Sequence, residues 1–382
     1  EPSSTPFEDD TISPNWITSN EELAAAAGRW GQVLGLDTEF QRTSTFYPLP
    51  GLYQVVSEGE IYLIDPLLVD DWTPLVSVLE DADRTLVMHA CGEDLELLSH
   101  HLGATPRGLF DTQLANAFLS PDFSLSYSNL VARHLDVTLG KPQTRSDWRR
   151  RPLSEAQVRY ACEDVLHLLE LHQQLRQSLE SAGRYEWFEE TMRTHGRYAT
   201  SDPDQYYLGF RKAWRFGGQQ LAALKRLAAW RERTAMLENV PRNRVIRDEH
   251  LLTFAERRSL DERTVREVLP QPVARRYGSA LVAEHQAARD AQAPSPIEPP
   301  LSQQQGEVSK QLRDVARAEA ERRDMAQELL ARRRDIERCI RHFEATGELS
   351  REYLGWREPL LGEPFRRILT RLGSEPPAER AG

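Results

Sequence analysis

The chain has 382 residues, of which 40% are hydrophobic, and this is enough apolar sequence for two or three domains with separate cores. No stretch approaches the roughly 20 apolar residues of a membrane helix, and the N-terminus lacks the basic-then-apolar order of a secretory signal. The formal net charge is −11, and three cysteines are too few for a disulfide framework or a zinc site, so we expect a reducing, cytoplasmic setting without membrane contact.

Residues up to about 200 alternate between strand-like and helix-like segments. Strands are predicted at 33–40, 52–57, 61–65 and 86–89, and helices around 20–29, 74–81, 93–102, 112–119, 126–135 and 154–181. The two strand-like runs on either side of Glu58-Gly59-Glu60 are typical of a hairpin. This pattern predicts a mixed sheet flanked by helices.

The first long strand ends in two carboxylates, Asp37 and Glu39, one residue apart. Successive side chains of a strand point to opposite faces, so these two acids share one face. Two like charges repel there unless a cation lies between them, and hard divalent ions prefer such oxygen ligands. A strand that runs out into a polar loop explains this segment alone equally well.

Two later segments could supply partners for these acids. Asp94 lies in the first turn of a predicted helix, where a negative charge also suits the helix dipole. Tyr160 and Asp164 lie four residues apart on one face of a helix that Ser154 and Gln157 open with a capping-box pattern. A solvated surface pair is the alternative interpretation of Tyr160 and Asp164 taken alone.

The second half of the chain is predicted to be helical and differs in charge. Residues 1–200 hold 15 basic and 31 acidic residues, whereas residues 211–290 hold 17 basic and 10 acidic ones. An acidic half repels a phosphate backbone unless metal ions and a basic neighbour compensate, and residues 211–290 are the candidate neighbour. A solvated helical surface would give the same excess. Helices are expected from about 221, at 248–258, 261–268 and 274–287, and again between 301 and 372, after a proline-rich linker.

The order and spacing of these motifs resemble the DEDD superfamily of exonucleases, tyrosine branch, and most closely the ribonuclease D family. Both helical segments resemble the helicase-and-ribonuclease-D C-terminal (HRDC) domain, the first more than the second. The flanking segments that carry the resemblance are Phe40-Gln41-Arg42-Thr43, Phe46-Tyr47-Pro48, Ile64-Asp65-Pro66, Phe110-Asp111-Thr112-Gln113, Ser146-Asp147-Trp148 and Arg151-Pro152-Leu153.

The resemblance implies an α/β ribonuclease-H-like exonuclease domain at residues 1–205, followed by two all-α HRDC domains at 206–291 and 301–382 with a linker at 292–300. It implies a monomeric, metal-dependent 3′→5′ exoribonuclease that releases 5′-mononucleotides with two divalent ions, Mg²⁺ or Mn²⁺. The expected partner is RNA with a 3′ single-stranded tail, such as precursor tRNA or another small stable RNA.

The same resemblance assigns roles to individual residues. Asp37, Glu39, Asp94 and Asp164 would hold the metal ions, and Tyr160 would orient the attacking water. The expected substrate contacts are Thr38, Phe40, Tyr47, His89 and Arg151, and the expected RNA contacts of the first HRDC domain are Arg211, Lys212, Trp214, Arg215, Arg242 and Arg244. Core packing for Phe40, a hydrogen-bonded place at a strand end for His89 and loop anchoring for Arg151 are alternatives.

Two other functions fit parts of the sequence. A DNA-directed exonuclease of the same superfamily would use the same acids, since the ions do not read the sugar. A catalytically silent nucleic-acid-binding protein could use the helical domains alone, but the presence of all five motif residues argues against it. A calcium-binding module lacks the required loop spacing.

Overall fold

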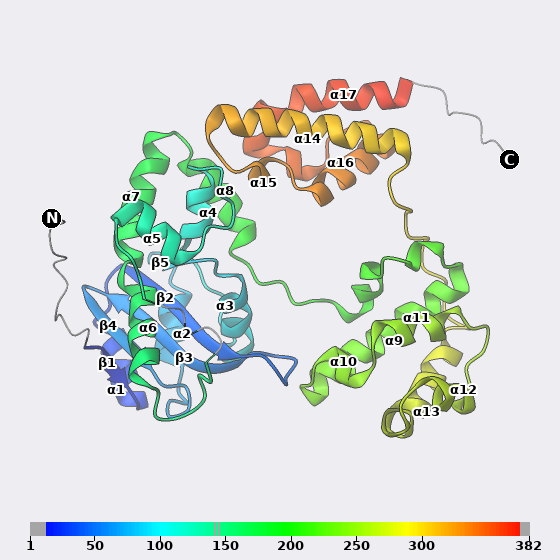
Figure 1. The fold of residues 1–382 in the computed structure, drawn as a ribbon, viewed down its shortest axis with the longest axis horizontal. Helices are drawn as coiled ribbons and strands as arrows, with labels where there is room; N and C mark the ends of the chain where they lie inside the picture. The colour runs from blue at the N-terminus through cyan, green and yellow to red at the C-terminus, as the bar shows by residue number, and fades with distance from the viewer. Residues whose placement is uncertain (1–12, 141–142, 144–145, 375–382) are drawn as a thin grey trace, which may run out of the picture. The chain divides into compact units, whose positions relative to one another are not determined.

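A computed structural model describes residues 13–140, 143 and 146–374, and it divides into two compact units (Figure 1). Unit 1 comprises Glu1–Gln41, Pro50–Tyr198 and Leu301–Gly382, and unit 2 comprises Arg42–Leu49 and Ala199–Pro300. None of the helices in the described ranges is both long and apolar enough to cross a membrane.

Unit 1 is built on a six-stranded sheet with the strand order β1-β4-β3-β2-β5-β6. The pairs β1–β4, β2–β5 and β5–β6 are parallel and β3–β4 is antiparallel, so the predicted mixed sheet is confirmed. The strands are β1 (Asn15–Ile17), β2 (Val33–Gln41), β3 (Leu49–Ser57), β4 (Glu60–Ile64), β5 (Thr85–Met88) and β6 (Leu109–Asp111).

The predicted hairpin is the β3–β4 connection. Glu58 and Gly59 form its two-residue turn, with φ of 51° and 79°, and Ser57 pairs with Glu60. Positive φ at both turn residues matches the right-handed twist of the flanking strands, which explains why glycine occupies the second position.

Helices cover both faces of the sheet. They are α1 (Asn20–Ala27), α2 (Thr73–Leu79), α3 (Gly92–Leu97), α4 (Thr112–Ala117), α5 (Tyr127–Leu135), α6 (Glu155–Leu166), α7 (Leu168–Ser181) and α8 (Tyr185–His195). On β2, Leu34 and Leu36 join the core beneath α1–α3. Gly35 faces the other core, where an added Cβ would lie 2.5 Å from Val56 and 3.0 Å from Leu168. The alternation therefore fixes which side chains of β2 face each layer.

Three features of unit 1 differ from the sequence prediction. The helix predicted at 154–181 is broken at His167 (φ −100°, ψ 1°), which separates α6 from α7. The strands β1 and β6 were not predicted, because three residues are too few for a period-two pattern. The helix α8 was not predicted either.

The C-terminal helices share the core of unit 1. They are α14 (Gln303–Arg323), α15 (Gln327–Leu330), α16 (Arg333–Thr346) and α17 (Glu363–Ser374). The Trp356 ring stacks on Trp187 of α8 with centroids 5.2 Å apart, and its Nε1 donates to Thr191 Oγ1 at 3.1 Å. The Ala326 backbone N–H also donates to the Ala117 carbonyl at 2.8 Å. These contacts pack α14–α17 against α4 and α8 within unit 1.

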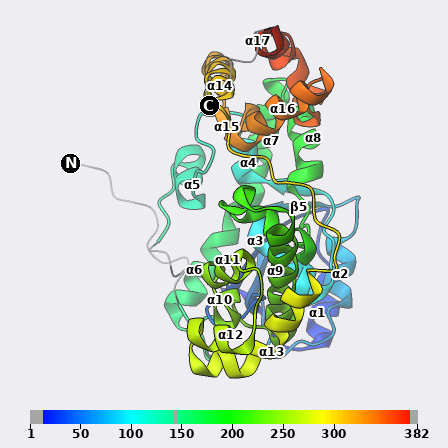
Figure 2. The same ribbon diagram turned by 90° about the vertical axis from the view of Figure 1, so that its right-hand side faces the viewer.

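Unit 2 is a helical bundle, and its helices are drawn in green and yellow and labelled in Figure 2. Its helices are α9 (Gly218–Glu238), α10 (Arg242–Val245), α11 (Asp248–Glu256), α12 (Glu262–Val268) and α13 (Gln271–Ala287). The β2–β3 loop also belongs to this unit. The Asn239 side-chain oxygen accepts the backbone N–H groups of Phe46 and Tyr47 at 3.1 and 3.0 Å. The Arg242 guanidinium lies 4.6 Å from the centroid of the Phe46 ring.

Candidate active site

Three carboxylates from β2 and α6 converge in unit 1. One ligand atom each of Asp37, Glu39 and Asp164 lies within 4.8 Å of the other two. The β2–β5 pairing covers Val33 to Gly35 only, so the two acids of β2 lie beyond its end. The predicted capping box is present at the start of α6, and this fixes the helix that carries Asp164.

The fourth acid, Asp94, lies in the first turn of α3 and is buried, with 8% of its surface exposed. The Thr38 hydroxyl donates to Asp94 Oδ1 at 2.5 Å. Asp94 contributes charge to the same site, because it raises the pKa of both Glu39 and Asp164. It does not belong to the set of three acids whose ligand atoms lie mutually within 4.8 Å.

Burial and mutual repulsion make the site unfavourable for negative charge. Burial, followed by the charges of Asp37, Asp164 and Asp94, raises the pKa of Glu39 to about 10. The pKa of Asp164 rises to about 7, chiefly through burial, and burial also raises the pKa values of Asp37 and Asp94. Among the described residues, no basic side chain contributes to these four shifts.

These acids fit divalent cations. Asp164 Oδ2 is buried and has no hydrogen-bond partner among the described residues. An unpartnered carboxylate oxygen beside two further carboxylates is the hard-oxygen donor set that Mg²⁺ and Mn²⁺ take. Cations bound here would offset the repulsion among the four carboxylates, to whose pKa shifts no basic side chain of the described residues contributes.

Tyr160 lies one helical turn before Asp164 on α6. Its ring centroid is 6.0 Å from that of buried Trp148, and its phenol lies close enough to Asp164 for the two groups to shift each other's pKa. Burial raises the pKa of Tyr160 well above its usual value, and the charges of Asp164, Glu39 and Asp37 raise it further. The phenol therefore keeps its proton at neutral pH beside the acid cluster.

Two residues expected at the substrate have hydrogen-bond partners within the protein, in line with the alternative interpretation given for each. The His89 ring bonds through Nδ1 to Thr112 Oγ1 at 2.9 Å and through Nε2 to the Leu125 carbonyl at 3.1 Å. Burial lowers the pKa of His89, so the ring is neutral at neutral pH.

Arg151 uses all five donor positions of its guanidinium. Nε and Nη2 hold both oxygens of Asp65, at 2.6 and 2.7 Å. The other N–H groups donate to the carbonyls of Trp148, Arg150 and Gly51 at 2.8, 3.0 and 2.8 Å. This arrangement ties the loop before α6 to the sheet.

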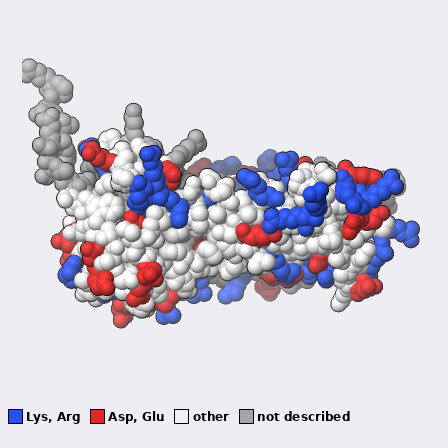
Figure 3. All heavy atoms as spheres, turned by 90° about the horizontal axis from the view of Figure 1, so that it is seen from below, with Lys and Arg blue, Asp and Glu red and all other residues white. Residues whose placement is uncertain are grey.

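The remaining expected contacts lie in two places. Phe40 is partly buried against the core beneath α1–α3, whereas Tyr47 belongs to unit 2. In unit 2, Arg211, Lys212, Arg215 and Arg244 are exposed, and the Arg215 guanidinium lies 5.0 Å from the centroid of the Trp214 ring. Arg242 is held by Glu232, with Nε 2.6 Å from Oε2. Figure 3 shows groups of Lys and Arg side chains on the surface of this unit, at the right of the view.

The sequence analysis did not assign a role to Asp111, which anchors the loop that leads to Asp94. Its oxygens accept the backbone N–H groups of Ala90 and Cys91, both at 3.1 Å, and His195 Nε2 lies 3.2 Å away. Burial opposes its ionisation, but hydrogen bonds and the nearby histidine lower its pKa to about 2. Asp111 lies between a strand and a helix and caps α4, and an acid at such a position could have been predicted from sequence to have a structural role.

Comparisons with known proteins agree with this arrangement. A 3′-5′ exonuclease family model matches residues 14–180, and an HRDC domain model matches residues 220–284. The chain is 38% identical to ribonuclease D of Pseudomonas paraeruginosa over 365 residues, which cover 93% of this chain and 97% of that protein. It is 32% identical to ribonuclease D of Escherichia coli over 369 residues, covering 92% and 97%.

The fold can be compared with a solved structure. The crystal structure of Escherichia coli RNase D, an exoribonuclease involved in structured RNA processing, matches with a TM-score of 0.88 and 30% identity. The match covers 94% of this chain and 99% of that chain.

Proposed function

Because this chain belongs to the ribonuclease D family and is a 3′→5′ exoribonuclease, we propose that it hydrolyses RNA by a two-metal-ion mechanism and releases 5′-mononucleotides. The observation that carries the proposal is the convergence of Asp37, Glu39 and Asp164 within 4.8 Å, with one oxygen of Asp164 left without a partner.

The four acids would have different roles in holding the ions. Asp37 would contribute to holding both ions, Glu39 and Asp164 would help to hold one of them, and Asp94 would help to hold the second. When bound, Mg²⁺ or Mn²⁺ supplies an activated water and neutralises charge on the attacking and leaving oxygens. The Tyr160 hydroxyl, held protonated beside Asp164, orients that water by a hydrogen bond.

The proposed substrate contacts are the side chains that are at least partly exposed and are not held by other protein groups. Phe40 adjoins Glu39 and is partly exposed, so it is suited to stack on the terminal base. Thr38, His89 and Arg151 act through the protein groups that they hold. In unit 2, Arg211, Lys212, Arg215 and Arg244 are exposed cations suited to phosphate, with Trp214 beside them.

We propose that the substrate is the 3′ tail of a folded RNA, such as precursor tRNA. The related Escherichia coli enzyme is an exoribonuclease involved in structured RNA processing. Residues 211–290 carry 17 basic and 10 acidic residues, so they suit the phosphate backbone of the folded part while the tail enters the acidic site. The enzyme acts as a monomer in the cytoplasm under this proposal.

We also propose that residues 301–382 form a second HRDC-like domain, while 1–205 form the exonuclease domain, 206–291 the first HRDC domain and 292–300 the linker. The helices α9, α10 and α11 begin at residues 218, 242 and 248, and α14, α15 and α16 begin at 303, 327 and 333, a constant offset of 85.

The conformations at equivalent positions support this internal repeat. The C-caps Asn239 and Asp324 have φ of 48° and 49°. At the start of each helix a glutamine Oε1 accepts the N-cap backbone N–H, from Gly217 to Gln220 at 3.1 Å and from Ser302 to Gln305 at 2.9 Å. The offset places Ala316 and Gln327 at the positions of Arg231 and Arg242, so the second copy lacks the ion pairs of the first.

A time course on a 3′-extended tRNA and on matched RNA and DNA oligomers tests the proposed function. We expect stepwise 3′ shortening of RNA that requires a divalent metal and stops with a chelator. Asp37→Ala should abolish it. Retention of activity in that variant, or equal digestion of the DNA oligomer, would contradict the proposal.

A further inference from the structure

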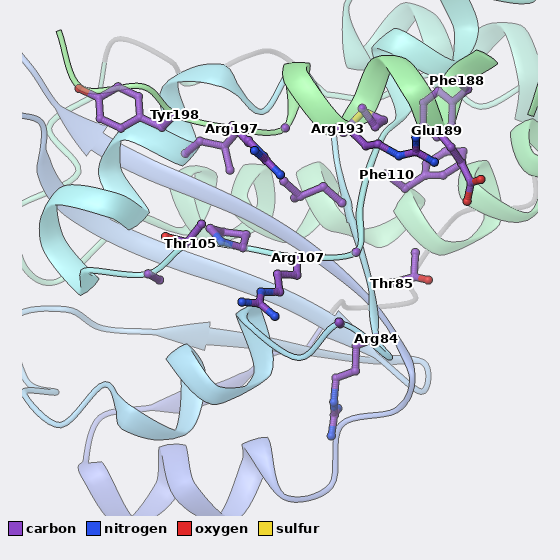
Figure 4. Close-up of a pocket in the computed structure, with 18 of the residues that line it drawn as sticks. Arg84, Thr85, Thr105, Arg107, Phe110, Phe188, Glu189, Arg193, Arg197 and Tyr198 are labelled. Carbon is purple, nitrogen blue, oxygen red and sulfur yellow. The ribbon is translucent and has the colours of Figure 1, made fainter. Parts of the chain in front are cut away.

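A second concave site lies in unit 1, around the starts of β5 and β6 and the end of α8. It has a volume of about 750 Å³ and is lined by residues 82–85, 104–110 and parts of 185–198, together with Leu95 and Ser99 of the α3 region. Figure 4 shows its labelled side chains, with Arg107 on one wall and Arg193 and Arg197 on the other. We name it the arginine pocket.

The charge of the arginine pocket is opposite to that of its surroundings. Four arginines line it against two acids, Asp83 and Glu189, although residues 1–200 as a whole hold 15 basic and 31 acidic residues. The floor contains Phe110, Phe188 and Met192, which bring no charge. Thr85, Ser99 and Thr105 add hydroxyl groups to the lining.

Three of the four arginines are available for a ligand. Arg84 is already held by the protein, since its Nε pairs with Asp81 at 3.1 Å and its Nη1 donates to the Trp30 and Gly31 carbonyls at 2.9 and 2.8 Å. Arg107, Arg193 and Arg197 are exposed, and within the described ranges none of their guanidinium groups has a hydrogen-bond or ion-pair partner.

The wall that carries two of these arginines is held against the sheet. Gly196 lies between Arg193 and Arg197, and an added Cβ there would meet Leu109 Cδ1 at 3.0 Å. His195 bonds to Asp111 at the end of β6. The arginines are therefore presented from a fixed backbone, and guanidinium groups in such a setting match phosphate oxygens.

From this geometry we infer that the arginine pocket binds backbone phosphates of the RNA substrate, upstream of the bond that is cut; the inference rests on the proposed function. β5 starts at the pocket with Thr85 and ends at Met88, before the loop that leads to Asp94. At about 3.3 Å per residue the strand spans about 13 Å. A trinucleotide with a free 5′ hydroxyl has one phosphate upstream of the bond that is cut, and adjacent phosphates lie closer together than about 13 Å, so it is too short to reach both sites.

The test measures hydrolysis of a short and a longer RNA, by a pocket variant and by a matched control variant. Steady-state hydrolysis is measured for the pocket variant Arg193→Gln/Arg197→Gln and for the control variant Arg313→Gln/Arg317→Gln. Arg313 and Arg317 are exposed arginines of α14 in the same unit, so the two variants change the net charge equally. We expect the pocket variant to raise KM for an RNA of about 15 nucleotides by about tenfold and to lower the salt slope of binding by about 2. Activity on the trinucleotide should not change, and the control should match the unaltered enzyme.

Three results would overturn the inference. They are an unchanged KM on the longer RNA, an equal loss on the trinucleotide, and direct binding of AMP or inorganic phosphate that the pocket variant loses while its KM for RNA stays normal. The last result would assign the pocket to free nucleotides. Failure of the unaltered enzyme to hydrolyse even the trinucleotide would instead contradict the proposed function.

Discussion

The Thr38 hydroxyl donates to Asp94 Oδ1 at 2.5 Å and so joins the strand that carries Asp37 and Glu39 to the helix that carries the fourth acid. This hydrogen bond lowers the pKa of Asp94, against the larger effects of burial and of the Asp37 charge, which raise it. Thr38 thus helps a buried carboxylate to ionise.

Thr38→Val should weaken metal binding about tenfold and lower kcat/KM similarly, because a hydrogen bond to a charged group contributes about 1.5–3 kcal/mol. Calorimetric titration with Mn²⁺ measures the first effect. Thr38→Ser keeps the hydroxyl and should retain most of the affinity. If Thr38 contacts the substrate instead, Thr38→Val will raise KM and leave the affinity for Mn²⁺ unchanged.

Tyr160→Phe should reduce turnover by about 10²–10⁴-fold, the usual contribution of a group that positions a proton or water in the transition state. The ring beside Trp148 is preserved in this variant, so Mn²⁺ affinity should stay within about twofold. Single-turnover hydrolysis and metal titration on the same preparation separate the two effects. Parallel loss of both would show that Tyr160 is structural.

The acid cluster should make the metal-free protein less stable as pH rises. The pKa of folded Asp164 is about 7 and that of Glu39 about 10. A raised pKa means that the fold favours the protonated form, so the stability contribution is complete below about pH 4 and is lost as pH rises through these values. With chelator, Tm should fall by about 5 °C between pH 5 and pH 8, and less in Asp164→Asn.

Metal should reverse this trend, since it binds the deprotonated acids. Added Mg²⁺ or Mn²⁺ should raise Tm more at pH 8 than at pH 5.5, as measured by scanning calorimetry. Asp164→Asn should lose most of this response. A metal effect that is independent of pH, or equal in the variant, would contradict the assignment of the site.

Arg151→Gln should lower the free energy of unfolding by about 2–4 kcal/mol, because it leaves buried Asp65 without its partner. Denaturant unfolding gives this value directly. The exposed neighbour Arg150 is the matched control, and Arg150→Gln should change stability by less than about 0.5 kcal/mol. Normal stability with a higher KM in Arg151→Gln would instead indicate a phosphate contact.

Local rules explain which parts of this molecule could be predicted from sequence. Asp37 and Glu39 share a strand face and Tyr160 and Asp164 share a helix face, and both relations follow from chain geometry alone. The convergence of these groups in one site depends on tertiary contacts, and it could be predicted only from the resemblance to a known family. The break at His167 has no proline or glycine to announce it.

Other features could not be predicted because several partners act together. Arg151 could be read as a phosphate contact, and only its carbonyl and Asp65 partners show that its donors are occupied. The constant offset of 85 residues between the starts of α9–α11 and those of α14–α16 could not be predicted, because the helix starts and C-cap conformations correspond while the side chains at equivalent positions differ.

The β2–β3 loop gives the chain an interwoven connectivity. The chain passes from one unit to the other four times, after residues 41, 49, 198 and 300. A domain appended at one end of a chain would need one such junction, and a domain inserted into a chain would need two. Excision of residues 199–300 would strip the loop of Asn239 and leave the Phe46 side chain, now 7% exposed, open to water. Removal of the helical unit would therefore also expose the β2–β3 loop, which begins three residues after Glu39 of the acid cluster.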